Sequence, residues 1–217
     1  MKLYGFWRSL ATYRVRVALA LKGVKVDDIS IDILKGEQHK QEYTAMNPQA
    51  VVPSLVIEDG KPPLFQSLAI LEYLEETHPN PPLLPKDARG RARVRGLALI
   101  AAADGHPLVV PRIRTYLEKE MHQDEAARNR WLAHWTMEAL RAIESHLVKE
   151  RETGRFCHGD QVTFADICLA GQVIAATAYF KADTASVPTA MRIYNECMKL
   201  DAFANAHPLK QPDAKAH

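Results

Sequence analysis

A proline-rich segment near residue 80 divides this chain into two parts with different sequence patterns. Proline stands at positions 79, 81, 82 and 85, and it stops a helix because it lacks an amide hydrogen and clashes with the preceding turn. Strand and helix signals alternate before this segment, whereas only helix signals follow it. We therefore predict an α/β domain at residues 1–80, a linker at 81–87 and an all-α domain at 88–217.

The first part predicts a small mixed sheet. Apolar or alternating runs indicate strands, longer periodic runs indicate helices, and Asp59-Gly60 is a strong hairpin turn. The predicted strands are 2–6, 28–33, 54–57 and a return at 64–65, and the predicted helices are 13–22, 37–46 and one that Ser67 caps. The order β-α-β-α-β-β-α is typical of a thioredoxin-like domain, in which one crossover and a final hairpin share a sheet.

The second part predicts a helical bundle. Its helical runs cover 89–103, 108–120, 126–149, 164–179 and 188–200. Thr163 and Asp166 have the spacing of a capping box at the start of the fourth run. Arginines at 89, 91, 93 and 95 are interpreted as a solvated helix face. The tail from Gln211 to His217 is polar, and we expect it to be frayed.

Composition excludes several classes of protein. The chain has 217 residues, of which 47% are hydrophobic, so it is not disordered. Its 28 lysines and arginines against 26 aspartates and glutamates leave a net charge of +2, too balanced for a duplex-binding protein. No apolar run has the length of a membrane span, and no signal-peptide pattern opens the sequence. Three cysteines without metal-ligand spacing predict neither a disulfide framework nor a metal site. We expect a cytoplasmic protein without a nucleic-acid or membrane partner.

Hydroxyl and basic side chains lie between the first predicted strand and the first predicted helix. Arg8, Ser9 and Thr12 stand in this segment, where a strand–helix turn directs backbone amides and the positive end of the helix dipole toward one point. A hydroxyl there can donate a hydrogen bond to a thiolate and lower its pKa. The alternative is that Ser9 or Thr12 only caps the helix.

Two further features point to the same small sheet. Pro53 enters a strand, so it belongs at the strand start or in a cis turn, and a cis bond would present the backbone of Val52 to an extended peptide. Gln66 and Ser67 open a helix and can form a carboxylate receptor with its first amides. An ordinary loop proline and plain helix capping are the alternatives. Three such features on one sheet favour convergence on a small anionic peptide.

One candidate segment lies in the helical part. His106 follows Asp104-Gly105, and Arg112 comes six residues after His106. His106 either touches a ligand or is a structural histidine. Arg112 either binds a substrate carboxylate in a bidentate manner or is a solvated surface side chain.

A set of short motifs occurs in a fixed order along essentially the whole chain. They are Phe6–Ser9, Tyr13–Gly23, Asn47-Pro48, Val52-Pro53, Gln66–Glu76, Pro82–Pro85, His207-Pro208 and Gln211–Asp213. In this order they resemble the zeta-class glutathione transferases, which include the glutathione-dependent maleylacetoacetate and maleylpyruvate isomerases.

The resemblance implies glutathione as cosubstrate, a thioredoxin-like domain followed by an all-α domain, and a homodimer. It makes Ser9 the counterpart of the first serine in the family's Ser-Ser-Cys motif, and it leaves Thr12 as a second hydroxyl candidate. Arg8 and Arg112 would hold the substrate carboxylate and the developing enolate. The expected glutathione contacts are Ser9, Gln38 near the glycine end, Val52 at the cysteinyl unit, Gln66 and Ser67 at the γ-glutamyl carboxylate, and Asp104 and His106 from the second part.

The chain also departs from the family pattern. Leu10 and Ala11 replace the second serine and the cysteine of the motif, and Val110 stands where the family has asparagine. Around Ala176–Tyr179 the chain lacks an arginine of its bacterial relatives and is one residue longer. Each departure removes a polar contact to the electrophilic substrate, whereas the glutathione positions are largely intact.

We predict a glutathione-dependent cis–trans isomerase of a maleyl-type substrate, either maleylacetoacetate or maleylpyruvate. The thiolate adds to the cis double bond, the new single bond rotates, and elimination regenerates glutathione. One alternative is a glutathione transferase or dehalogenase that acts on α-halo acids or other small electrophiles, although reductive dehalogenation lacks a resolving cysteine at position 11. A further alternative is a non-catalytic glutathione-binding module.

Overall fold

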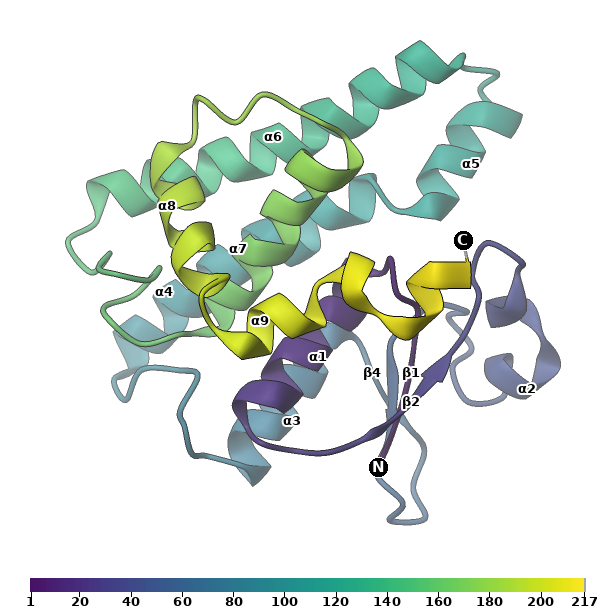
Figure 1. The fold of residues 1–217 in the computed structure, drawn as a ribbon, viewed down its shortest axis with the longest axis horizontal. Coiled ribbons are helices and arrows are strands. Elements are labelled where there is room, and N and C mark those ends of the chain that lie inside the picture. Colours follow the sequence, from purple (N-terminus) through teal and green to yellow (C-terminus); the bar gives the residue numbers. More distant parts are fainter. Residues whose placement is uncertain (217) are drawn as a thin grey trace. The chain divides into compact units, whose positions relative to one another are not determined.

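The computed structural model describes residues 1–216 (Figure 1). The chain forms two compact units. The first comprises Met1–Pro82 together with the segment that begins at Leu200, and the second comprises Leu83–Lys199. No helix among the described residues has both the length and the apolar character that crossing a membrane requires.

The first unit is built on a mixed sheet of four strands in the order β2-β1-β3-β4. The strands are β1 (Lys2–Gly5), β2 (Asp27–Ser30), β3 (Ser54–Val56) and β4 (Leu64–Phe65). β1 pairs with β2 in parallel, whereas the pairs β1–β3 and β3–β4 are antiparallel. The predicted β-α-β-α-β-β-α order is therefore confirmed, with one crossover and one hairpin in a single sheet.

Helices cover both sides of this sheet. α1 (Leu10–Leu21) and α3 (Ser67–Thr77) lie on one side, and α2 (Gln41–Thr44) lies on the other (Figure 1). α3 buries Ile70, Leu71 and Leu74 at helical spacing. On the side of α2, a smaller apolar cluster is centred on Phe6, Tyr43 and Val52.

The predicted helix over 37–46 is wrong. The segment forms a short 3-10 helix, η1 (Glu37–His39), and then α2, because Lys40 between them has extended backbone with φ of −66° and ψ of 146°. Tyr43 is the buried residue of these two helices. A single longer helix would need an apolar face that continues over several turns, and this segment does not supply one.

The end of α1 is tied to α3 by a buried ion pair. Lys22 Nζ lies 2.6 Å from Glu75 Oε2 and donates a second hydrogen bond of 2.7 Å to the carbonyl of Pro81. Both charged side chains are buried. Because each partner compensates the other's loss of hydration, removing one of them leaves an uncompensated charge in the core.

The C-terminal segment packs on the first unit, which corrects its assignment to the helical domain and the prediction of a frayed tail. α9 (Asp201–Ala206) contacts α1, and the chain continues as η5 (Pro208–Lys210) and η6 (Pro212–Ala216). The buried amide of Gln211 donates to the carbonyls of Asn205 (2.8 Å) and His207 (3.1 Å). These bonds order a segment whose polar composition suggests disorder. His217 lies outside the described residues.

The second unit is the predicted helical bundle. Its helices are α4 (Ala88–Leu99), η2 (Ile100–Gly105), η3 (His106–Leu108), α5 (Pro111–Lys119), α6 (Glu125–Lys149), α7 (Phe164–Ile174), η4 (Ala175–Tyr179) and α8 (Pro188–Cys197), with η2 and η4 in π geometry. Every residue of α7 is buried, and α7 contacts α4, α6 and α8. A helix that is apolar all round belongs at the centre of a bundle.

The capping box at the start of α7 is confirmed. Asp166 is fully buried and accepts hydrogen bonds of 2.7 Å from the amides of Thr163 and Cys157. Burial raises the pKa of Asp166 above its ordinary value, and the hydrogen bonds offset only part of that rise. The carboxylate thus fixes both the first turn of α7 and the loop before it.

Arg93 is not part of a solvated face. Its side chain is 12% exposed and donates to the Glu150 carboxylate, to Cys157 O (2.7 Å) and to Thr153 Oγ1 (3.0 Å). Burial raises the pKa of Glu150, but hydrogen bonds from His146 and Arg93 lower it by more, so the net pKa lies below the ordinary value of 4.5. The arginine therefore joins α4 to the end of α6 and the loop that follows.

Candidate functional site

The register of the sheet brings the candidate segments of the first unit to one edge. Gly5 at the end of β1 pairs with Ser30 at the end of β2, and Tyr4 pairs with Ser54 at the start of β3. Ser54 in turn pairs with Phe65 at the end of β4. The turn after β1, the loop after β2, the loop before β3 and the start of α3 therefore all meet the sheet at the same edge.

Ser9 lies in the turn between β1 and α1 and is the N-cap of α1. Its Oγ accepts a hydrogen bond of 3.2 Å from the amide of Thr12. A hydroxyl that accepts one bond through a lone pair still has its hydrogen to donate. Helix capping and donation to an anion are thus compatible roles for Ser9. Arg8, half-buried, stands next to it in the same turn.

Thr12 faces the sheet, which contradicts its assignment as a second hydroxyl for catalysis. Its side chain is fully buried, and its Oγ1 accepts from the amide of Phe6 at 3.5 Å. A Cβ added to Gly5 would stand 2.3 Å from Thr12 Cγ2, so β1 and α1 touch at this point. Thr12 is a packing residue of the strand–helix junction, and a solute cannot reach it.

The loop before β3 contains a cis peptide bond between Val52 and Pro53. Two side chains hold this loop from the α2 segment. Tyr43 Oη donates to the carbonyl of Val51 at 2.7 Å, and Asn47 Nδ2 donates to the same carbonyl at 2.8 Å. Burial raises the pKa of the Tyr43 hydroxyl, so it stays protonated and remains a donor. β3 begins two residues after Val52, and the predicted contact of its backbone with an extended peptide stays a prediction.

Gln66, and not Ser67, is the N-cap of α3. Gln66 has a positive φ of 66°, and no side chain caps the first turn of the helix. Its Nε2 donates to Gln49 Oε1 at 2.8 Å. Non-glycine residues with positive φ are rare and often occur at binding sites. The first turn of α3 therefore offers backbone amides and a positive dipole end to an anion at the sheet edge.

Ser67 is buried and accepts a hydrogen bond of 2.9 Å from Arg14 Nη1. Arg14 lies on α1 and is 3% exposed, so a guanidinium is held in the interior beside the start of α3. Arg14 is not among the site residues predicted from the sequence. The sequence nevertheless contains a signal for its role. An arginine between apolar residues on the inward face of a helix needs a polar partner.

Gln38 lies in η1, in the segment that follows β2. Its Oε1 is buried and accepts no hydrogen bond from any other residue that the structure describes. A buried amide oxygen without a donor costs about 1–3 kcal/mol. A ligand that brings an N–H to this position would recover that cost, which fits the expected contact with the glycine end of a peptide.

The remaining candidates belong to the second unit and fall within nine consecutive positions. Asp104 is exposed at the end of the π-helix η2, His106 is half-buried in η3, and Arg112 is exposed in the first turn of α5. Trp131 on α6 donates to the carbonyl of Leu108 at 2.8 Å and so fixes this segment. The roles assigned to these three residues stay predictions.

A π-helix also occurs where the resemblance indicates an extra residue. η4 spans Ala175–Tyr179, and the amide of Phe180 bonds to the carbonyl of Ala175 at 3.0 Å, five positions back. A π-turn holds one residue more than an α-turn. This geometry is consistent with the extra residue that the resemblance implies, which stays a prediction.

The three cysteines do not provide a nucleophile. Cys157, Cys168 and Cys197 are all buried, and none of the three forms a disulfide. Burial raises the pKa of Cys157 and of Cys197, and the carboxylate of Asp166 raises both further. A thiolate at the sheet edge therefore has to come from a ligand. Within residues 1–216, no group of three or more histidine, cysteine or acidic side chains can hold a metal ion.

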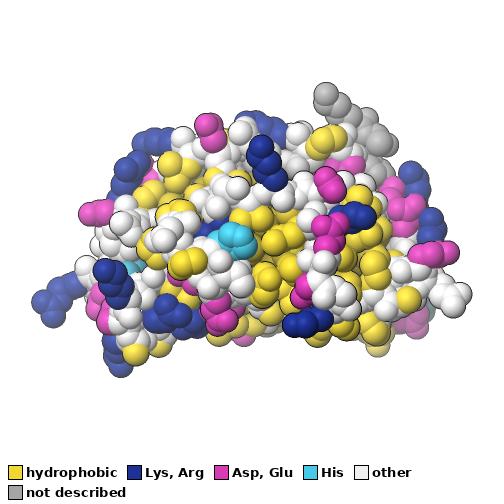
Figure 2. Space-filling model, turned by 90° about the horizontal axis from the view of Figure 1, so that it is seen from below, with side chains coloured by type: hydrophobic (Ala, Val, Ile, Leu, Met, Phe, Trp, Pro, Cys, Tyr) yellow, Lys and Arg dark blue, Asp and Glu magenta, His cyan; other side chains and the backbone are white. Residues whose placement is uncertain are grey.

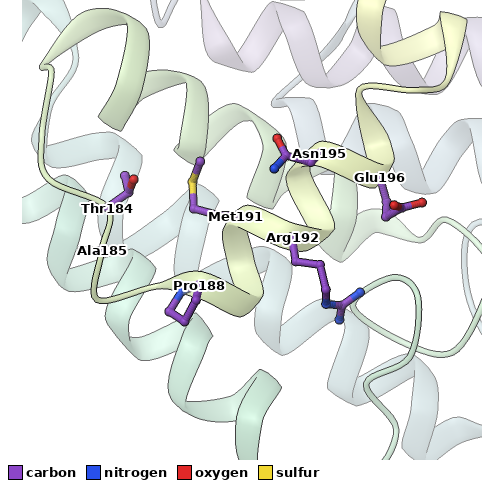
Figure 3. Close-up of a pocket in the computed structure, with 7 residues that line it drawn as sticks. All are labelled: Thr184, Ala185, Pro188, Met191, Arg192, Asn195 and Glu196. Atoms are coloured by element: carbon purple, nitrogen blue, oxygen red, sulfur yellow. The ribbon is translucent and has the colours of Figure 1, made fainter.

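One open pocket of about 540 Å³ lies on α8 in the second unit (Figure 3). Its charged groups already have partners in the protein. Arg192 donates to the carbonyls of Gly154 (2.9 Å) and Arg155 (3.1 Å), and Glu196 lies 3.0 Å from Arg155. None of the predicted site residues lines it, and its polar groups do not converge on a ligand.

Two family profiles match the chain. The profile "Glutathione S-transferase, N-terminal domain" matches residues 1–76, and "Glutathione S-transferase, C-terminal domain" matches residues 125–191. A maleylpyruvate isomerase of Ralstonia sp. is 44% identical over 214 residues, which cover 99% of this chain and all of that protein.

Solved structures of glutathione S-transferases are also similar to this chain over almost its whole length. The crystal structure of a maleylacetoacetate isomerase from Methylobacterium extorquens AM1, with bound malonate and GSH, superposes with a TM-score of 0.95 at 48% identity and covers 98% of both chains. A holo maleylpyruvate isomerase, described as a bacterial glutathione S-transferase of the zeta class, has a TM-score of 0.93 at 43% identity, over 98% of this chain and 99% of the other.

Proposed function

Because the chain belongs to the zeta class of the glutathione S-transferase family, we propose that it is a glutathione-dependent cis–trans isomerase of a maleyl-type substrate, either maleylacetoacetate or maleylpyruvate. The observation that carries the proposal is full-length similarity to enzymes with these activities. The geometry of the sheet edge supports it independently, since the register of the strands brings the hydroxyl of Ser9, the side chain of Arg8 and the uncapped first turn of α3 to that edge.

The residues at this edge fit glutathione. The uncapped first turn of α3, with Gln66 and Ser67, suits the γ-glutamyl carboxylate. The backbone of Val52 suits the cysteinyl unit, because an extended peptide can pair with a free strand-like edge. Gln38 Oε1, buried without a donor from the protein, suits an N–H of the glycine end. From the second unit, Asp104 and His106 are the expected contacts by similarity to the family.

Ser9 is the residue that we assign to thiol activation. A free thiol with a pKa near 8.5 is only a few per cent ionised at pH 7. Lowering that pKa by about one to two units stabilises the thiolate by roughly 1.4 to 2.7 kcal/mol. One donated hydrogen bond, together with the first amides of α1, is enough to supply this.

When bound, glutathione supplies the thiolate that adds reversibly to the cis double bond and leaves again after rotation about the resulting single bond. The protein orients the two reactants and holds charge. Arg8, next to Ser9, and Arg112, on the second unit, are assigned to the substrate carboxylate and to the negative charge that develops on the adjacent carbonyl oxygen. The protein donates no net proton over the cycle, because isomerisation leaves the atom count of the substrate unchanged.

A product assay tests this function. Maleylpyruvate, maleylacetoacetate and dichloroacetate are incubated with the protein, with and without glutathione, and the products are separated. We expect fumaryl products from a maleyl substrate only when glutathione is present. Turnover of dichloroacetate alone would instead support the transferase or dehalogenase alternative. Retention on glutathione-agarose without turnover of any substrate would support a binding module.

We also propose a homodimer in the cytoplasm. Each unit exposes large apolar side chains, among them Phe65 on β4 (57% exposed) and Leu99 on α4 (46% exposed). Figure 2 shows one face on which hydrophobic side chains are exposed between basic and acidic ones. Buried cysteines that form no disulfide suit a reducing compartment. Sedimentation equilibrium tests the dimer, since a monomer would refute it.

A further inference from the structure

Asp213, near the C-terminus, contacts the turn that carries Ser9. Its Oδ2 accepts a hydrogen bond of 3.0 Å from the amide of Trp7, a residue 206 positions earlier in the sequence and two positions before Ser9. The same oxygen accepts from Ser30 Oγ at 2.8 Å, at the end of β2. A single carboxylate thus joins the ends of two neighbouring strands at the edge where the candidate site lies.

Two other hydrogen bonds of this turn are local. The amide of Ser9 bonds to the carbonyl of Phe6 at 3.1 Å, and Ser9 Oγ accepts from Thr12 at 3.2 Å. These two bonds close the turn on itself. Asp213 adds a bond from outside the turn, and a carboxylate accepts more strongly from an amide than a neutral group does.

The tail that carries Asp213 is itself held in place. Gln211 is 7% exposed, its side chain caps the carbonyls of Asn205 and His207, and its own carbonyl accepts from the amide of Ala214 at 3.0 Å. α9 packs on α1, the helix that Ser9 caps. Figure 1 shows this segment running along α1 to the end of the sheet. The carboxylate of Asp213 is therefore presented by an ordered element.

We propose that Asp213 is a positioning residue for the reaction: it holds the Trp7–Ser9 turn so that the Ser9 hydroxyl meets the glutathione sulfur. The inference rests on the proposed function, because it assigns Asp213 a part in thiol activation. Asp213 touches neither substrate nor sulfur in this role and acts through Ser9. The tail thereby becomes part of the active-site structure, although it lies more than 200 positions from the turn in sequence.

The pKa of the bound glutathione thiol shows whether Asp213 acts by positioning Ser9 or by its own charge, because removing Asp213 would shift this pKa in opposite directions in the two cases. A carboxylate near a thiolate disfavours the anion, so if Asp213 acted only by its charge, removing it would lower the pKa of the bound thiol. If Asp213 acts by placing Ser9, removing it weakens the hydrogen bond to the sulfur, and the pKa of the bound thiol rises. The two roles thus predict shifts of opposite sign.

The experiment titrates the thiol of glutathione bound to the full-length protein by the ultraviolet absorbance of the thiolate, alongside kcat and KM. We expect Asp213→Ala to raise the pKa of the bound thiol by about half a unit to one unit, and to lower kcat at pH 7 about three- to tenfold with recovery at higher pH. The matched control is Lys210→Ala, an exposed residue of the same tail, which should leave both values unchanged.

If the alanine variant does not fold, two milder variants still test whether Asp213 acts by positioning Ser9 or by its charge. Asp213→Asn keeps an acceptor oxygen without the charge, and Asp213→Glu keeps the charge but displaces the acceptor. Positioning predicts a nearly wild-type thiol pKa for Asn and a raised one for Glu. The reverse pattern, or no change in any variant, would overturn the proposal. A wild-type protein that does not bind glutathione would refute the proposed function instead.

Discussion

Replacing Ser9 by alanine should produce two separate losses, because its hydroxyl has two roles in this account. As the N-cap of α1, Ser9 Oγ accepts from the amide of Thr12 at 3.2 Å. Losing a serine cap costs about 1 kcal/mol of stability, which corresponds to a Tm lower by roughly 2–4 °C in a chain of this length. As the donor to the thiolate, Ser9 shares with the first amides of α1 a lowering of the thiol pKa by about one to two units, so its loss should reduce turnover below that pKa by at most about ten- to a hundredfold.

Variants separate the two roles. Ser9→Asp keeps a good N-cap but at neutral pH has no hydrogen to donate, and its charge further disfavours a nearby thiolate. We therefore expect Ser9→Asp to restore the Tm and to be less active than Ser9→Ala. Ser9→Thr, which keeps both cap and donor, should retain most activity. Ser145→Ala on the exposed face of α6 is the matched control and should change neither property.

The assay is the dependence of kcat/KM on pH, measured with thermal unfolding of the same samples. The rising limb of the profile should move to higher pH in Ser9→Ala, with activity recovering once the thiol ionises without help. An unchanged profile and unchanged turnover at pH 7 would refute the role of Ser9. The donor would then be a backbone amide of the turn, because Thr12 is buried.

Three further changes test the structure around the site. Gly5→Ala should destabilise the protein by about 1–3 kcal/mol, because the added Cβ would stand 2.3 Å from Thr12 Cγ2, and Thr12→Ser should relieve part of that loss in a double-mutant cycle of urea unfolding. Glu75→Ala should cost about 3–5 kcal/mol in the same measurement, because Lys22 then loses its ion-pair partner in the core. A cost below about 1 kcal/mol would contradict the buried pair. Glu150→Gln should cost about 1 kcal/mol at pH 7. Because the pKa of Glu150 is lowered in the folded protein, that stabilisation is present above pH 4.5 and is lost as the pH falls through the lowered pKa, so the difference from wild type should vanish in acid.

Local signals in the sequence predict most of the fold. The strand and helix order of the first unit follows from alternation, turn residues and caps, and Gly23, with a φ of 66°, follows α1 as expected. The capping box of Thr163 and Asp166 is likewise a local pattern with a local partner. These features are predictable because the residues that form them lie within a few positions of each other.

The features that the sequence analysis missed depend on partners far along the chain. Arg14 bonds to Ser67, 53 positions away, and Asp213 bonds to Trp7 across 206 positions. Neither pairing follows from spacing or composition, because each depends on where the fold places two segments that are distant in the sequence. The polar tail was predicted to be frayed because its contacts with Trp7 and Ser30 join segments that are distant in the sequence. Arg93 was predicted to be solvated, because its partners Glu150 and Cys157 lie in other segments of the chain.

The central claim is that one edge of the sheet binds glutathione with its sulfur at Ser9. A crystal structure of this chain with glutathione tests it most directly. The account predicts the sulfur within hydrogen-bonding distance of Ser9 Oγ, the cysteinyl backbone beside Val52 and the γ-glutamyl carboxylate at the first turn of α3. A tripeptide bound elsewhere, or one whose sulfur lies away from the turn between β1 and α1, would contradict it.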